Sequence, residues 1–216
     1  MKLNKVMALA LSGLMAVSML AGCSNGTPNG EENGEQGQVV ANDIVSVLND
    51  SQDTVKFSAN TPLENALKAT GEKLKSSDIK NYTNNYNPNV VGSGTVAEAY
   101  QKVAPVGYET LQSVSNALFT SSVPTKEGQT TKNVLYVMNA KSMDLNSAVA
   151  MISNNLATSN YADMVLSGST EYNATYVGSA AATTVTKTDE SGDTYSVYLV
   201  AISITQNVTK ADSTVK

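Results

Sequence analysis

The sequence predicts an α+β fold in which helices cover both faces of a central antiparallel sheet, a three-layer α-β-α sandwich. Two observations lead to this prediction. Segments with helix caps and one apolar face occur along the chain, and such a face has to pack against another element. Runs rich in β-branched and aromatic residues follow, and some are apolar on both faces, which requires cover from two sides.

The composition divides the 216 residues into a leader, a linker and one domain. Residues 1–22 begin with two lysines and continue as an apolar run over 6–20, which is shorter than the ~20 residues that a spanning helix needs. Residues 23–38 are rich in Gly, Asn and Glu and have no large apolar side chain, so we expect a flexible tether. Residues 39–216 are expected to form a single domain, because they contain no repeat and no second linker.

Helix caps and apolar spacing predict the helices. One helix is expected over 61–74, because the sequence TPLE supplies a Thr N-cap, a Pro at the first helical position and a Glu at the third. The sequence TVAE predicts a second helix over 95–104, and an Asp N-cap with helical apolar spacing predicts a third over 145–156. Apolar spacing alone predicts a further helix over 108–118.

Strands are predicted between and after these helices. Residues 134–138 are apolar at every position, so we expect a central strand that is covered on both faces. Residues 172–187 and 194–205 are β-branched and aromatic runs, and the polar residues 188–193 between them indicate a hairpin connection.

The composition excludes several kinds of functional site. The chain has no His, Arg or Trp and a single Cys, which excludes His-based triads, His-ligated zinc and Arg clamps on phosphate. Its net charge is −5, and an acidic chain without Arg is poorly suited to replace the counterions of a phosphate backbone. We therefore expect no nucleic-acid partner, no metal and no cofactor.

Three short patterns each have a functional and a purely structural interpretation. Residues 92–97 match G-x-G-x-x-A, but almost no strand precedes them, so a loop before a capped helix is favoured. Asp189 and Asp193 supply too few ligands for tight calcium binding, and a solvated turn is favoured. Ser77-x-x-Lys80 resembles the Ser–Lys motif of penicillin-binding proteins and β-lactamases, although it follows a helix instead of opening one. A Ser–Lys type cell-wall hydrolase therefore stays an alternative.

The end of the leader, Leu20-Ala21-Gly22-Cys23, resembles the lipobox of bacterial lipoproteins. In that family the Cys thiol is diacylated and the chain is cut just before it. The resemblance implies that Cys23 is the lipidation site, and that a diacylglycerol on Cys23 holds the protein on the outer side of the bacterial cell membrane. Two acyl chains anchor a protein where one does not.

The second half of the chain resembles the CAP superfamily, the SCP-like extracellular domains. The residues that carry the resemblance are a strand beginning Asn133-Val134, a helix with Ala148-Val149 and Ile152, the segment SNYADMVL over 159–166, the segment YNATYVG over 172–178, and a last strand TYSVY over 194–198. The family implies an α-β-α sandwich over about 42–205. Its His-based metal site cannot exist here, because the chain lacks His.

If the fold is CAP-like, the region of the lost metal site would form a cleft lined by Tyr, Asn and Lys. Its candidate residues are Tyr82, Asn84, Lys132, Asn133, Asn160 and Tyr161. We therefore expect an extracytoplasmic, lipid-anchored domain that is not an enzyme and that binds a cell-wall polymer, a glycan or a protein. The alternatives are the Ser–Lys hydrolase and a scaffold subunit of a surface complex.

Overall fold

The computed structural model describes residues 41–113, 118–119, 122–156 and 161–211. The chain divides into two units, 1–36 and 37–216, and all described residues belong to the second. The predicted leader, the lipidation site Cys23 and the tether lie outside the described residues.

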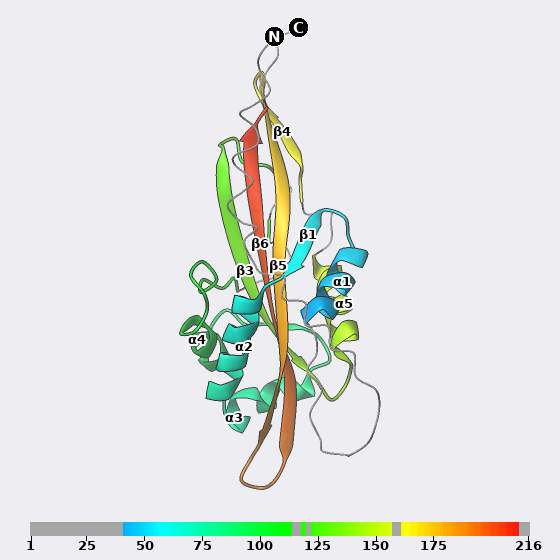
Figure 1. The fold of residues 1–216 in the computed structure, drawn as a ribbon, viewed down its shortest axis with the longest axis vertical. Helices are drawn as coiled ribbons and strands as arrows, with labels where there is room; N and C mark the ends of the chain where they lie inside the picture. Colours follow the sequence, from blue (N-terminus) through cyan, green and yellow to red (C-terminus); the bar gives the residue numbers. More distant parts are fainter. Residues whose placement is uncertain (1–40, 114–117, 120–121, 157–160, 212–216) are drawn as a thin grey trace, which may run out of the picture. The chain divides into compact units, whose positions relative to one another are not determined.

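A mostly antiparallel sheet of six strands forms the middle of the fold (Figure 1). The strands are β1 (Val55–Ala59), β2 (Asn89–Val90), β3 (Gly128–Asn139), β4 (Met164–Ser167), β5 (Thr170–Thr188) and β6 (Thr194–Lys210). Their order is β1-β5-β6-β3-β2, and β4 pairs with β5 beyond the end of β1. Only β1 runs parallel to its neighbour. The α+β class and the hairpin predicted around 188–193 are confirmed.

Helices cover both faces of this sheet. They are α1 (Ala41–Asp50), α2 (Thr61–Lys73), α3 (Ser76–Ile79), the 3₁₀ helix η1 (Lys80–Asn84), α4 (Thr95–Gln101) and α5 (Leu145–Asn155). The helices α1 and α5 lie on one side of the sheet, and α2, α3 and α4 lie on the other (Figure 1). The arrangement therefore has three layers.

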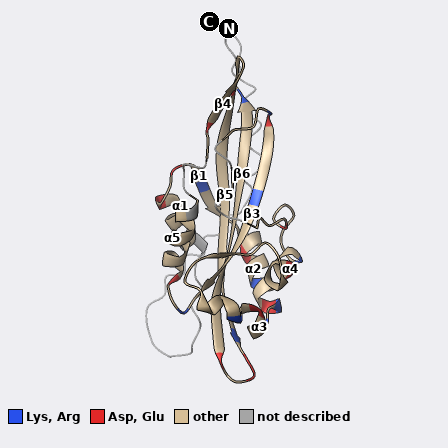
Figure 2. Cartoon of the chain, turned by 180° about the vertical axis from the view of Figure 1, so that it is seen from behind, with Lys and Arg blue, Asp and Glu red and all other residues tan. Residues whose placement is uncertain are grey.

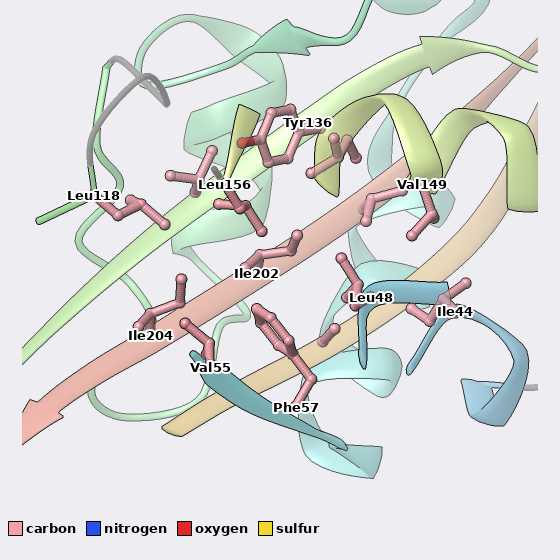
Figure 3. Packing of buried hydrophobic residues seen from close by; sticks show 14 of the residues in the cluster. Ile44, Leu48, Val55, Phe57, Leu118, Tyr136, Val149, Leu156, Ile202 and Ile204 are labelled. Atoms are coloured by element: carbon pink, nitrogen blue, oxygen red, sulfur yellow. The ribbon is translucent and has the colours of Figure 1, made fainter. Parts of the chain in front are cut away.

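Each face has its own hydrophobic core. In the first core, Ile44 and Leu48 of α1 and Val149 of α5 pack against Tyr136 and Ile202 of the sheet (Figure 3). The second core lies on the opposite face. There Leu63 and Leu67 of α2 and Tyr100 of α4 pack against Leu135 and Leu199. Neighbouring residues along β3 and β6 thus enter different cores, as the alternation of side chains along a strand requires.

The predicted central strand is confirmed by burial on both faces. Every side chain from Val134 to Met138 is at most 1 % exposed, and those from Val197 to Ile202 of β6 are at most 9 % exposed. The strands β3 and β6 pair along their whole common length, with Val134 opposite Ile202.

Two helix starts differ from the prediction by one residue. The N-cap of α2 is Asn60 and not Thr61, because the Asn60 Oδ1 accepts a hydrogen bond from the Leu63 N–H at 2.9 Å. The N-cap of α4 is Gly94, whose φ of 82° favours glycine, and not Thr95. The predicted Asp144 N-cap of α5 is confirmed by a 2.9 Å bond from the Ser147 N–H to Oδ1.

The helix predicted over 108–118 is wrong for the residues that are described. Residues 108–113 run beside β3 instead, where Leu111 forms a parallel bridge to Asn133 and the Gln112 N–H donates to the Asn133 carbonyl. The apolar residues of this segment do not share one helical face, since Tyr108 and Leu111 pack against the second core and Leu118 belongs to the first.

Side-chain amides of the α1 region close the outer edge of β1. The Asn49 amide donates to the Phe57 carbonyl at 3.0 Å and accepts from the Phe57 N–H at 2.8 Å. The Gln52 amide does the same for Val55, with both distances 2.7 Å. These amides take the places of a neighbouring strand, so this edge offers fewer free groups to another chain.

We expect Gln52→Ala to lower the free energy of unfolding by about 2 kcal/mol, because it leaves the buried N–H and carbonyl of Val55 without partners. Urea denaturation checks this value. The matched variant Asn49→Ala acts at a less buried position and is expected to cost about half as much. An unchanged denaturation midpoint for Gln52→Ala would show that the hydrogen bonds from the Gln52 amide to Val55 contribute nothing to stability.

Val197→Asp is expected to abolish folding, because it places an unpaired charge at a position that is 0 % exposed in the second core. Circular dichroism and the yield of monodisperse protein report this. Thr184→Asp is the control, since Thr184 is exposed on the neighbouring strand opposite Tyr198. A folded Val197→Asp protein would contradict the buried position of β6.

Candidate functional site

The six residues predicted to line one cleft do not lie on one face of the sheet. Lys132 and Tyr161 lie on the side of the first core, where both are next to Phe119. Tyr82 packs against the second core, on the other side of the sheet. Asn133 also points to that side, and Asn160 lies outside the described residues. The prediction of a single cleft is therefore corrected.

Tyr161 belongs to a closed aromatic cluster with Phe119 and Tyr176. The ring centroids of Tyr161 and Tyr176 are 5.0 Å apart in an edge-to-face arrangement, and those of Phe119 and Tyr176 are 5.6 Å apart. The Tyr176 hydroxyl donates to the Ala162 carbonyl at 2.6 Å and accepts from the Gln206 amide at 3.0 Å. Edge-to-face contacts of this kind stabilise a core, so the cluster is a packing element.

Lys132 is the charged member of this group. Its Nζ lies 4.9 Å from the centroid of the Phe119 ring, at the distance of a cation–π contact. The Lys132 side chain is half-buried and lies on the same face of β3 as Val134 and Tyr136. Lys132 therefore extends the aromatic cluster to the surface and does not leave an opening into it.

The Tyr161 hydroxyl is buried and has no hydrogen-bond partner among the residues that the structure describes. The residue is only 8 % exposed, and burial raises the pKa of its phenol well above the ordinary value. Such a phenol stays neutral at physiological pH and is out of reach of a ligand in solution. Tyr161 therefore is not the ligand-contacting residue that the sequence suggested.

Asn133 organises the loop beside β3. Its side-chain amide donates to the carbonyl of Gly107 at 2.9 Å and to the carbonyl of Thr110 at 3.3 Å. Asn133 is 4 % exposed. Its role is structural, because both donors are used to hold residues 107–110 against the sheet.

Tyr82 and Asn84 belong to η1, beside the second core. Tyr82 is half-buried, and its burial raises the pKa of the phenol. Asn84 is exposed at the end of η1. The Asn139 amide donates to the Thr83 carbonyl at 2.5 Å, which fixes η1 to the end of β3. These residues form a connection between elements, away from Lys132 and Tyr161.

The Ser77-x-x-Lys80 pattern does not form a nucleophile and base pair. Ser77 is exposed, and its hydroxyl lies 3.5 Å from the Asp78 carboxylate. The Lys80 ammonium lies 5.0 Å from the centroid of the Tyr195 ring, and the Tyr195 hydroxyl raises the pKa of Lys80. A general base needs a lowered lysine pKa, so this arrangement does not suit Ser–Lys catalysis.

The acidic turn of the β5–β6 hairpin is occupied by its own hydrogen bonds. The Asp189 carboxylate accepts from the N–H groups of Ser191 and Asp193, both at 3.0 Å, and from the Tyr195 hydroxyl at 3.2 Å. Within the described ranges, no group of three or more His, Cys, Asp or Glu side chains is placed to hold a metal ion.

Sequence reasoning missed one surface, the end of the sheet that extends beyond α2 and α4 (Figure 1). Polar side chains share one face there, and we call six of them the polar sheet face: Gln129, Thr131, Thr175, Thr205, Asn207 and Thr209. Directly paired residues lie on the same face of a sheet. Four of the six are exposed, and Thr205 and Asn207 are half-buried.

The polar sheet face is built in rows across the strands. Thr131, Thr205 and Val177 form one row, and Thr175, Asn207 and Gln129 form the next. The hydroxyls of Thr131 and Thr205 are hydrogen-bonded to each other at 2.8 Å. The signal in the sequence is a polar residue at every second position in 171–179 and 203–209, with Val177 as the apolar exception. The β-branched character of these runs alone does not reveal this pattern.

Charged side chains stand only at the borders of the polar sheet face in the described part of the chain. Lys56 lies opposite Val177 on β1, Glu171 precedes Asn173 on β5, and Glu127 comes just before β3. In Figure 2 most Lys, Asp and Glu positions lie on helices, loops and strand ends. The blue stretch within β3 is Lys132, whose side chain lies on the side of the first core, beside Phe119.

Tyr161→Phe is expected to leave the free energy of unfolding unchanged or to raise it by about 1 kcal/mol, because it removes a buried hydroxyl that no described residue bonds. Tyr161→Ala is expected to lower it by about 4 kcal/mol, since it empties the centre of the aromatic cluster. Thermal and urea unfolding give both values. A Tyr161→Ala protein with wild-type stability would place Tyr161 at the surface instead.

No family model, curated protein or solved structure matches the chain. None of the helices in the described ranges combines the length and the apolar character that crossing a bilayer requires.

Proposed function

We propose that this protein is a lipid-anchored, extracytoplasmic binding domain, and not an enzyme, whose ligand is a cell-wall polymer, a glycan or a protein. One observation carries the proposal. The only Cys of the chain stands at position 23, directly after a basic start, a short apolar run and the small residues Ala21 and Gly22. This is the arrangement that lipidation of a secreted chain needs.

The chemistry of the domain supports binding more than catalysis. The chain has no His and no Arg, and its one Cys would carry lipid. Lys80, the lysine of the Ser–Lys pattern, has a raised pKa and is placed against an aromatic ring. With this composition, a partner would be bound mainly through hydroxyl and amide groups on the surface.

As part of this proposal, the domain resembles the CAP superfamily in its fold only. The resemblance is supported by the position of β3 beside β6 and by helices at 61–73 and 145–155 on opposite faces of one sheet. It supplies no functional residue, because Tyr82 lies on the other side of the sheet from Lys132 and Tyr161.

The anchor is tested with Cys23→Ser, which removes the proposed acylation site. We expect the variant to leave the membrane fraction and to lose incorporation of labelled palmitate, because two acyl chains are needed for stable attachment. Ser24→Ala is the matched control and is expected to stay in the membrane fraction. A Cys23→Ser protein that still needs detergent for release would overturn the anchor, and stoichiometric fluorophosphonate labelling of a Ser would overturn the non-enzymatic function.

A further inference from the structure

We propose that the polar sheet face binds a linear, uncharged polysaccharide. This inference rests on the proposed function, and it names the surface and the ligand class. The six residues of the polar sheet face come from β3, β5 and β6, so one ligand chain can cross all three strands.

The geometry of the face matches a repeating, hydroxyl-rich ligand. Strands are ~4.8 Å apart, and same-face residues along a strand are ~6.8 Å apart. Side-chain hydroxyls and amides are therefore spaced regularly over this face. The bond between the Thr131 and Thr205 hydroxyls orders part of this array before any ligand arrives, which lowers the entropy lost on binding.

The absence of charge selects against several ligand classes. Lys56, Glu127 and Glu171 stand at the borders of the face, and no Arg exists in the chain. A nucleic acid or an anionic wall polymer would find almost no cation to replace its counterions. A cationic ligand would find no carboxylate in the centre, so the face suits a neutral ligand.

The residue types also favour a polysaccharide over a protein. Protein interfaces are enriched in Tyr, Trp, Met and Arg, and Ser and Thr are rare among the residues that dominate their binding energy. The polar sheet face has none of these enriched residue types. Its side chains are Thr, Asn and Gln from three neighbouring strands. Val177, which is 50 % exposed beside Thr205, adds an apolar contact for the C–H groups of a sugar ring.

A face without aromatic rings binds each sugar weakly, because neutral hydrogen bonds to water are exchanged for equivalent bonds to the ligand. Many copies anchored in one membrane would contact one polymer at the same time. Such multivalent binding raises the overall affinity without new contacts. Binding should therefore be measured on a polymer and not on a short oligosaccharide.

The test uses the full-length lipidated protein in detergent, sedimented with insoluble chitin and with cellulose. The variant Thr131→Val/Thr175→Val removes two hydroxyls without changing side-chain shape. The matched control is Thr184→Val, an exposed threonine of β5 on the opposite face of the sheet. Gln129→Glu is a second probe, because it adds a charge to the face and keeps the size of the side chain.

We expect the wild type to bind at least one polymer equally well from about 50 mM to about 500 mM NaCl, since no charges are involved. The double variant should bind about tenfold more weakly, Gln129→Glu should also weaken binding, and Thr184→Val should bind like the wild type.

Three outcomes would overturn the inference: sedimentation of the wild type with neither polymer, equal binding by the double variant, or loss of binding at high salt. Membrane release of Cys23→Ser is measured separately. A domain that is anchored but ignores both polymers therefore refutes the ligand class and leaves the proposed anchoring intact.

Discussion

The fold depends on the burial of β6 on both faces. From Val197 to Ile202 all side chains are buried, and they alternate between two cores. A strand of this kind cannot be stable in a two-layer fold, because one apolar face would stay in water. The pairing with β3 on one side and β5 on the other satisfies its backbone groups. Helices on both faces are therefore a requirement of this strand.

The three long strands stop being buried on both faces at the same level. Asn133, Ser203 and Ser179 form one row across β3, β6 and β5. On one side of this row, β3 and β6 carry buried apolar side chains on both faces, from Val134 to Met138 and from Val197 to Ile202. On the other side, the face of the first core still holds Ile204 and Val208, while the opposite face becomes the polar sheet face. The positions of Asn133, Ser179 and Ser203 in the sequence thus indicate how far the helices α2 to α4 cover the sheet.

Patterns of this kind explain how much could be predicted from the sequence. The central strand, the hairpin and the helices at 61 and 145 were predictable, because each has a local pattern of burial or capping. The edge strand β1 was not, since its partners are the amides of Asn49 and Gln52 and residues of β5 far along the chain. The single cleft was predicted from the order of elements alone. Order does not determine which side of a sheet a connection crosses, and η1 with Tyr82 lies on the side of the second core.

The polar sheet face also differs from the way in which this protein protects its other exposed strands. The outer edge of β1 is closed by side-chain amides, so its free groups are used within the chain. Solubility alone would be met on the polar sheet face by charged residues, which are the ordinary means of keeping a protein surface soluble. Lys and Glu are instead confined to its borders, at Lys56, Glu127 and Glu171. The polar sheet face is exposed, ordered and neutral at its centre. It therefore keeps the protein soluble without Lys or Glu, the residues that would do so most effectively. That choice is explained if the centre has to make hydrogen bonds to an uncharged ligand, because a fixed charge there would have to lose its water on binding.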